Sequence, residues 1–268
     1  MDDEGPFESS RYLIRFAEKE IADLEAAIRA FHDTKPYAVL TELNPQTGQY
    51  ELKIKGVRPL PWQFRGAASN IIKNLRDALD QAVASATELI TGRENAHSHF
   101  PFGEGPDDLE NSLSRRKAGR CKGIAPELYD VLRRAEPYPT RETHPGGNDI
   151  LKVLNKVSGP NKHKVTITTS ARIGEHTYGG GLMKFGKGGG RIGVDDRWDR
   201  AKNQFVLMAF GADAVMDDVK VQAAMDVAFN NSFLRDVPVI DFLRSALIHV
   251  TKVVEDVAAE ALRIGPRD

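Results

Sequence analysis

Apolar residues recur every three or four positions in three long stretches of the chain. The first runs from about residue 10 to 33, the second from 62 to 91, and the third begins near Pro238. This spacing collects apolar side chains on one face of an α-helix. The second stretch ends at Gly92, a residue type that often follows a helix C-terminus. We therefore predict long N-terminal, central and C-terminal amphipathic helices.

Elsewhere the period changes to two, which is typical of β-strands. YAVLTEL and QYELKIKG flank the turn-forming segment NPQTG and predict a β-hairpin. Further strand-like stretches lie at 164–173, 205–210 and 219–229. Their short polar or glycine-containing connections favour antiparallel pairing. Short helices are predicted in DLENSLSRR, APELYDVLRRA and NDILKVLNKV.

These elements predict a single α+β domain over residues 1–268, in which a bundle of long amphipathic helices packs with a mainly antiparallel β-sheet. The predicted order is a helix-hairpin-helix (8–91), a long polar and basic loop (92–125), short helices (126–160), a β region (161–232) and a C-terminal helix (236–264). The first and last helices carry heptad-like apolar seams. These seams suit either an internal bundle or a homodimer through the long helices.

Composition narrows the class of protein. Hydrophobic residues make up 41% and charged residues 28% of the chain, as in ordinary globular proteins. The net charge of −1 means that any nucleic-acid contact comes from a local basic patch. Cys121 is the only cysteine, which excludes an intrachain disulfide. The acidic start MDDEGPFESS does not resemble a signal peptide, and no run of 18 apolar residues occurs, so we expect a cytoplasmic protein with no membrane span.

The central helix carries polar residues that could form a site. Arg76 and Asp80 lie four residues apart, on the side of the helix that also holds Asn74 and Gln81. One interpretation is a solvated face with ion pairs. The other is an anion site in which Asp80 holds the Arg76 guanidinium and Asn74 adds an amide.

Two basic segments could supply phosphate ligands. In NKHK, His163 stands between Lys162 and Lys164 at a predicted helix-to-strand junction, where it could bind a phosphate and transfer a proton. In RRKAGRCKG, the candidate phosphate-binding residues are Arg115, Arg116 and Arg120. Both segments could equally be ordinary solvated loops.

The order NLRDALDQAVA, HFPF, EPY, GGNDILKVLNKV and NKHK resembles a broad family of uncharacterised bacterial and phage proteins over about residues 60–165. More loosely, the helical part resembles the HEPN helical-bundle superfamily, which contains many metal-independent ribonucleases and toxins. The resemblance implies an Arg and His pair, with Arg76 as the arginine. Gln81 stands where the histidine would fall, and a glutamine cannot act as a general base.

Three functional hypotheses follow, and they leave open whether the chain is an enzyme. In the first, a HEPN-like protein binds or cleaves RNA without a metal or cofactor: His163 takes a proton while Arg76 and Lys162 stabilise the phosphate. In the second, the polar motifs form a buried structural network in a non-catalytic interaction protein. In the third, the chain is a ligand-binding or metal-dependent enzyme in which the 92–122 loop is a lid over His97 and His99. These two histidines could chelate a metal, although no carboxylate or cysteine pair stands at a recognised ligand spacing.

The segment GGGLMKFGKGGGR resembles a phosphate-binding loop only superficially. It lacks the GKS or GKT ending and no helix follows it, so we predict a flexible connection between strands.

Overall fold

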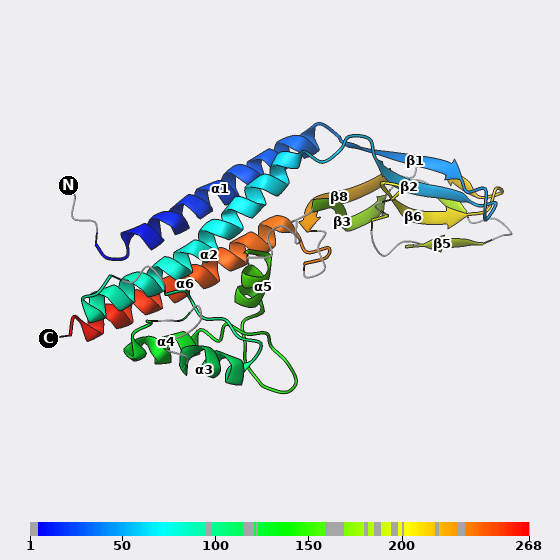
Figure 1. Ribbon diagram of the computed structural model, residues 1–268. Helices are drawn as coiled ribbons and strands as arrows, with labels where there is room; N and C mark the ends of the chain where they lie inside the picture. Colours follow the sequence, from blue (N-terminus) through cyan, green and yellow to red (C-terminus); the bar gives the residue numbers. More distant parts are fainter. Residues whose placement is uncertain are drawn as a thin grey trace. The chain divides into compact units, whose positions relative to one another are not determined.

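The computed structural model describes most of the chain and confirms an α+β fold (Figure 1). The described residues are 5–94, 98–114, 121, 123–158, 169–179, 182–184, 189–193, 198–199, 201–217, 220–229 and 234–267. For 169–179, 182–184, 215–217 and 220–225 only the backbone is described. Contacts divide the chain into two compact units: residues 1–24, 66–167 and 240–268 form the first, and 25–65 and 168–239 form the second. The boundaries at 24/25 and 65/66 lie inside two long helices. The single domain that the sequence predicted stays a prediction.

The long helices form where the 3.6-residue apolar period predicted them. They are α1 (Glu8–Asp33), α2 (Trp62–Thr91) and α6 (Val239–Ile264). In the first unit α2 makes polar contacts with α1, where Ser9 donates to Gln81 Oε1 over 2.6 Å, and α1 pairs with α6 through Arg11 and Glu255 at 2.6 Å. Figure 1 shows the three helices running alongside one another.

The apolar seams of α1 and α6 are buried within the one chain. On α1 the buried positions include Ile14, Ala17 and Ile21, and on α6 they include Val250 and Val254. A homodimer through the long helices therefore stays a prediction, and it would have to use other faces of these helices.

Short helices complete the first unit. They are α3 (Pro106–Ser114), the 3₁₀ turn η1 (Pro126–Leu128), α4 (Tyr129–Arg134) and α5 (Asp149–Ser158). The stretch from Gly92 to Pro126, predicted as a polar loop, holds α3 and several buried residues, among them Phe100, Leu109 and Leu113. These apolar side chains pack against the unit, so the described part of this stretch is not simply a solvated connection.

The second unit contains the strands. They are β1 (Tyr37–Leu43), β2 (Tyr50–Gly56), β3 (Thr169–Gly179), β4 (Leu182–Lys184), β5 (Gly190–Ile192), β6 (Gln204–Phe210), β7 (Val215–Asp217) and β8 (Lys220–Phe229). The described strands form a four-stranded sheet of order β1-β2-β6-β5 and two pairs, β3-β8 and β4-β7, all antiparallel. The predicted hairpin and antiparallel pairing are confirmed. The glycine-rich segment predicted as a connection instead contributes β4 and part of β5.

One face of the four-stranded sheet carries an apolar core. Its buried residues come from β2, β6 and the segment before β6: Leu52, Ile54, Trp198, Phe205, Leu207, Met208 and Phe210. Burial of these side chains drives the packing of the sheet. β1 and β5 are the edge strands, and the register of β1 with β2 has no bulge over its seven residue pairs.

Candidate functional site

Asp80 is the centre of a polar cluster in the first unit. Its carboxylate pairs with the guanidinium of Arg76, one helical turn earlier on α2, and accepts a 2.8 Å hydrogen bond from the Phe100 backbone N–H. Its second oxygen lies 3.1 Å from Nδ1 of His99. The cluster therefore joins α2 to the segment 98–104, far along the chain.

His99 has the geometry of a residue that can transfer a proton. Its side chain is 46% exposed, and only Nδ1 has a hydrogen-bond partner among the described residues. A carboxylate at Nδ1 favours the tautomer that carries the proton there, which leaves Nε2 as a free base. The arrangement is that of a His and Asp pair in which the imidazole side chain is half exposed.

The Arg76 side chain is buried and held in place by its neighbours. Only 8% of the residue is exposed, its guanidinium lies 4.7 Å from the centre of the Phe102 ring, and Phe102 packs edge-on against Phe100 at 5.0 Å. The cation and ring attraction adds to the ion pair with Asp80. In this position Arg76 orients Asp80 and the segment 98–104, and it offers little surface to a phosphate.

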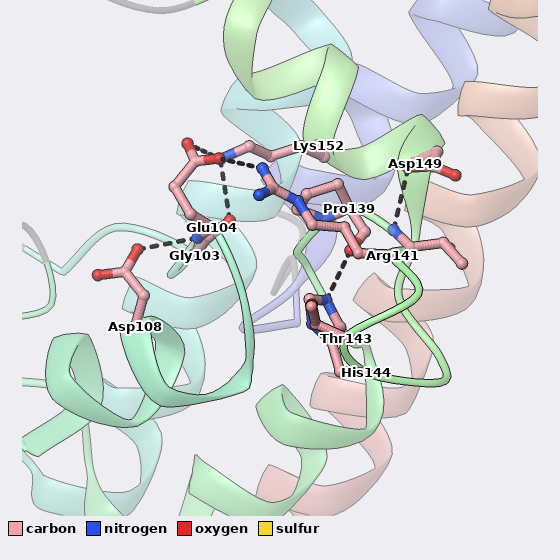
Figure 2. Close-up of polar contacts among 10 residues, drawn as sticks. Gly103, Glu104, Asp108, Pro139, Arg141, Thr143, His144, Asp149 and Lys152 are labelled. Atoms are coloured by element: carbon pink, nitrogen blue, oxygen red, sulfur yellow. Dashed lines mark hydrogen bonds and ion pairs between the residues drawn. The ribbon is translucent and has the colours of Figure 1, made fainter.

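A second polar cluster holds the other end of this segment (Figure 2). Lys152 on α5 is 5% exposed and donates to the Gly103 carbonyl at 2.9 Å and to Glu104 Oε1 at 2.6 Å. Arg141 lies 3.6 Å from the other Glu104 oxygen, and Asp108 accepts from the Glu104 N–H. The hydrogen bond from Lys152 lowers the pKa of Glu104 below its ordinary value. This cluster anchors the segment next to α5.

His144 lies in the same region but is fully engaged. Its Nε2 lies 2.9 Å from the Pro139 carbonyl and its Nδ1 lies 3.2 Å from the Thr143 hydroxyl (Figure 2). The carbonyl can only accept, so Nε2 carries the proton and Nδ1 accepts from Thr143. His144 therefore has no ring nitrogen left for a metal or a substrate.

The loop between α4 and α5 links the clusters. Gly103 N–H donates to the Pro137 carbonyl at 3.1 Å, and Asn148 N–H donates to the Tyr138 carbonyl at 2.8 Å. Asn148 then caps α5 by accepting from Leu151 N–H at 3.0 Å. Of the five segments that carry the family resemblance, four thus meet in one hydrogen-bonded region; the fifth, NKHK, lies outside the described residues.

Some of the predicted site residues lie in the described part of the chain and the others lie outside it. Arg76 and Asp80 are in contact, as their spacing predicted. Asn74 donates to Glu20 Oε2 on α1 at 2.9 Å, and burial raises the pKa of Glu20. The remaining candidates lie outside the described residues: His97, Arg115, Arg116, Arg120, Lys162, His163 and Lys164.

Sequence reasoning considered His99 as a metal ligand and did not recognise its pairing with Asp80. The pair is separated by 19 positions and joined only by tertiary packing. The available signal was HFPF, one of the five segments on which the predicted resemblance rests. No group of three or more potential metal ligands occurs among the described histidine, cysteine and acidic residues.

No protein-family model, curated protein or solved structure matches the chain. Within the described part of the chain, none of the helices has the length and apolar character needed to cross a membrane.

Proposed function

We propose that this chain is a metal-independent RNA-cleaving protein in which His99, rather than Gln81, supplies the histidine that a HEPN-like site requires. The observation that carries the proposal is the contact of Asp80 with His99 Nδ1 while the imidazole stays half exposed. Arg76 is then a positioning residue, because it is buried against Asp80 and Phe102.

The reaction is an internal phosphoryl transfer. His99 Nε2 takes the proton of a ribose 2′-hydroxyl, and the 2′-oxygen attacks the adjacent phosphorus. The bond from phosphorus to the 5′-oxygen breaks, and that oxygen takes a proton from a general acid. The products are a 2′,3′-cyclic phosphate and a 5′-hydroxyl. The sequence predicted His163 as the base; in this proposal His99 takes that role and His163 is the acid. The predicted phosphate ligands stay Arg115, Arg116, Arg120, Lys162 and Lys164, while Asn74, also predicted as one, donates to Glu20 instead.

The test is RNA cleavage by the purified protein with and without EDTA. His99→Gln keeps a polar side chain but removes the base, so we expect a loss of at least about 100-fold in cleavage rate. Thermal stability should change little, because His99 is half exposed. His249→Gln on α6 is the matched control and should keep wild-type activity. Intact RNA in the wild-type reaction, or an active His99→Gln variant, would contradict the proposal.

A second candidate function has a specific observation in its favour. Arg76 and Lys152 are 8% and 5% exposed, and both are ion-paired at the ends of the segment 98–104. Ion pairs in which the cation is buried suit a non-catalytic scaffold that presents a surface to a partner. On this hypothesis Arg76→Met lowers the unfolding midpoint and no variant cleaves RNA.

The resemblance to the HEPN superfamily also implies a role in defence or as a toxin, which a cellular experiment can test. A cytoplasmic ribonuclease expressed from an inducible promoter should slow bacterial growth, and His99→Gln should relieve the effect at equal protein level. Equal growth inhibition by both proteins would argue against RNA cleavage as the cause.

A further inference from the structure

The outer edge of β1 carries main-chain groups that pair with no strand in the described part of the chain. In the hairpin, Asn44 N–H donates to the Gln49 carbonyl and Val57 N–H donates to the Pro36 carbonyl. Hydrogen-bonded pairs alternate along an antiparallel ladder, so the main-chain N–H and C=O groups of the even-numbered residues of β1 point toward β2. The main-chain groups of its odd-numbered residues, Tyr37, Val39, Thr41 and Leu43, therefore face the open edge, where no described strand pairs with them.

This edge has few of the features that normally prevent pairing. β1 contains no lysine, proline or bulge, and it pairs with β2 in unbroken register. Two apolar side chains along it are exposed, Val39 at 51% and Leu43 at 53%. The edge thus offers both a row of hydrogen-bonding groups and an apolar rim.

We propose that a second copy of this chain adds to the edge, with β1 pairing antiparallel to the partner's β1 about a two-fold axis at Leu40. This register overlaps all seven residues of both strands, and Tyr37 faces Leu43 while Val39 faces Thr41. About eight main-chain hydrogen bonds form across the axis, because four residues on each strand expose one donor and one acceptor. The two four-stranded sheets then become one continuous sheet.

The charges on the face of the sheet that carries Glu42 complement this register. Glu42 faces Ala38 across the axis, and Ala38 is paired on its own sheet with Lys55. Two strand spacings separate Glu42 of one copy from Lys55 of the other, about 10 Å between backbones, which the two side chains can span. Lys55 already lies 3.9 Å from Glu42 of its own chain, so each lysine stands between two carboxylates. No like charges face each other in this register.

Cysteine cross-linking tests the register in the full-length protein. Leu40 would face its own copy in a non-hydrogen-bonded pair, in which Cα atoms are about 4.5 Å apart and a disulfide can form. Leu40→Cys should therefore give a covalent dimer on mild oxidation. Ala38→Cys should not, but should do so when combined with Glu42→Cys. The wild-type chain, whose Cys121 is buried, is the control.

Sedimentation velocity over a range of concentrations tests the interface. Val39→Lys places a charge on the edge and should weaken dimerisation at least about tenfold. Val57→Lys is the matched control, because Val57 is 57% exposed but lies beyond the edge row. Thr41→Pro removes one outward N–H and should also weaken the dimer. A monomer at every concentration, a dimer unaffected by Val39→Lys and Thr41→Pro, or absence of the Leu40→Cys cross-link would overturn the proposal.

Discussion

Asp80 shows how one side chain can satisfy several groups at once. It neutralises a nearly buried guanidinium, accepts a backbone N–H and orients an imidazole. A carboxylate with these partners contributes to folding and, on our proposal, to catalysis. The two contributions can be separated, because Arg76 and Phe100 are the folding partners and His99 is the reactive one.

Replacement of Asp80 by asparagine should destabilise the protein. The change leaves the Arg76 charge without its carboxylate at a site that is 8% exposed, so we expect a loss of about 1–3 kcal/mol in the free energy of unfolding. Urea denaturation measures the effect. Asp77→Asn is the control: its partner Lys73 is 57% exposed, and the change should cost about 0.5 kcal/mol or less. Equal losses for the two variants would mean that the Arg76–Asp80 pair contributes no more to stability than the exposed Lys73–Asp77 pair.

The loop before α5 is the element that brings together the four described segments on which the predicted resemblance rests. Gly146 and Gly147 both have positive φ, and Gly147 packs directly on the backbone at 138–140. The sequence showed that GG precedes the helix, but it did not show what the glycines contact. Those contacts are made with residues seven or more positions away.

Gly147→Ala should be strongly destabilising. Gly147 has φ of +114°, and an added Cβ would lie 2.7 Å from Thr140 N and 2.8 Å from the Tyr138 carbonyl oxygen, both backbone atoms that cannot move easily. We expect a loss above about 2 kcal/mol by thermal unfolding. Gly48→Ala, with φ of +70° and nothing within 4 Å, isolates the conformational cost and should lose about 1 kcal/mol. A smaller loss at Gly147 than at Gly48 would contradict the packing.

Asn148 links the start of α5 to α6. Its Oδ1 accepts from Leu151 N–H, so its Nδ2 is the atom that donates to His249 Nδ1 at 3.0 Å. Asn148→Ala removes both contacts and should cost about 1–2 kcal/mol. Asn148→Asp keeps the cap but cannot donate to a neutral imidazole. Near neutral pH its stability should therefore lie between that of the wild-type protein and that of Asn148→Ala. If Asp and Ala variants unfold at the same denaturant concentration, the cap is not the source of the stability.

At the scale of the whole molecule, ion pairs between distant segments tie the first unit together. Hydrogen bonds from their basic partners lower the pKa values of three glutamates: Glu104 beside Lys152, Glu110 beside Arg133 and Glu255 beside Arg11. In the second unit, burial lowers the pKa of His32 below 6.5. All four groups bind protons more readily in the unfolded chain.

Stability should therefore fall as the pH decreases. The His32 contribution is complete above pH 6.5 and is lost below it, and the glutamate contributions are complete above pH 4.5 and are lost as the pH falls through their lowered values. Urea midpoints measured between about pH 7 and pH 3 test this. Glu104→Gln should flatten the acidic part of the curve. A raised pKa, as at half-buried Glu20, works in the opposite direction, and Glu20→Gln should steepen the curve. A midpoint independent of pH would contradict these shifts.

By itself the sequence determined the local elements. The predicted central helix matches α2, Trp62–Thr91, and the predicted hairpin matches β1 and β2, because apolar period and turn residues act within a few positions of each other. The contact between Arg76 and Asp80 could also be predicted from the sequence, since one helical turn separates them. The short strands β4, β5 and β7 were missed, because three residues are too few to show a period.

Only the tertiary structure decided which polar residues meet. It placed His99 on Asp80 and Lys152 on Gly103, contacts that span 19 and 49 positions and depend on how whole helices pack. It also showed that the seams of α1 and α6 are used inside the chain, while the edge of β1 is left open among the described strands. Such long-range contacts depend on the total free energy of burying many side chains, which cannot be read from a local sequence pattern.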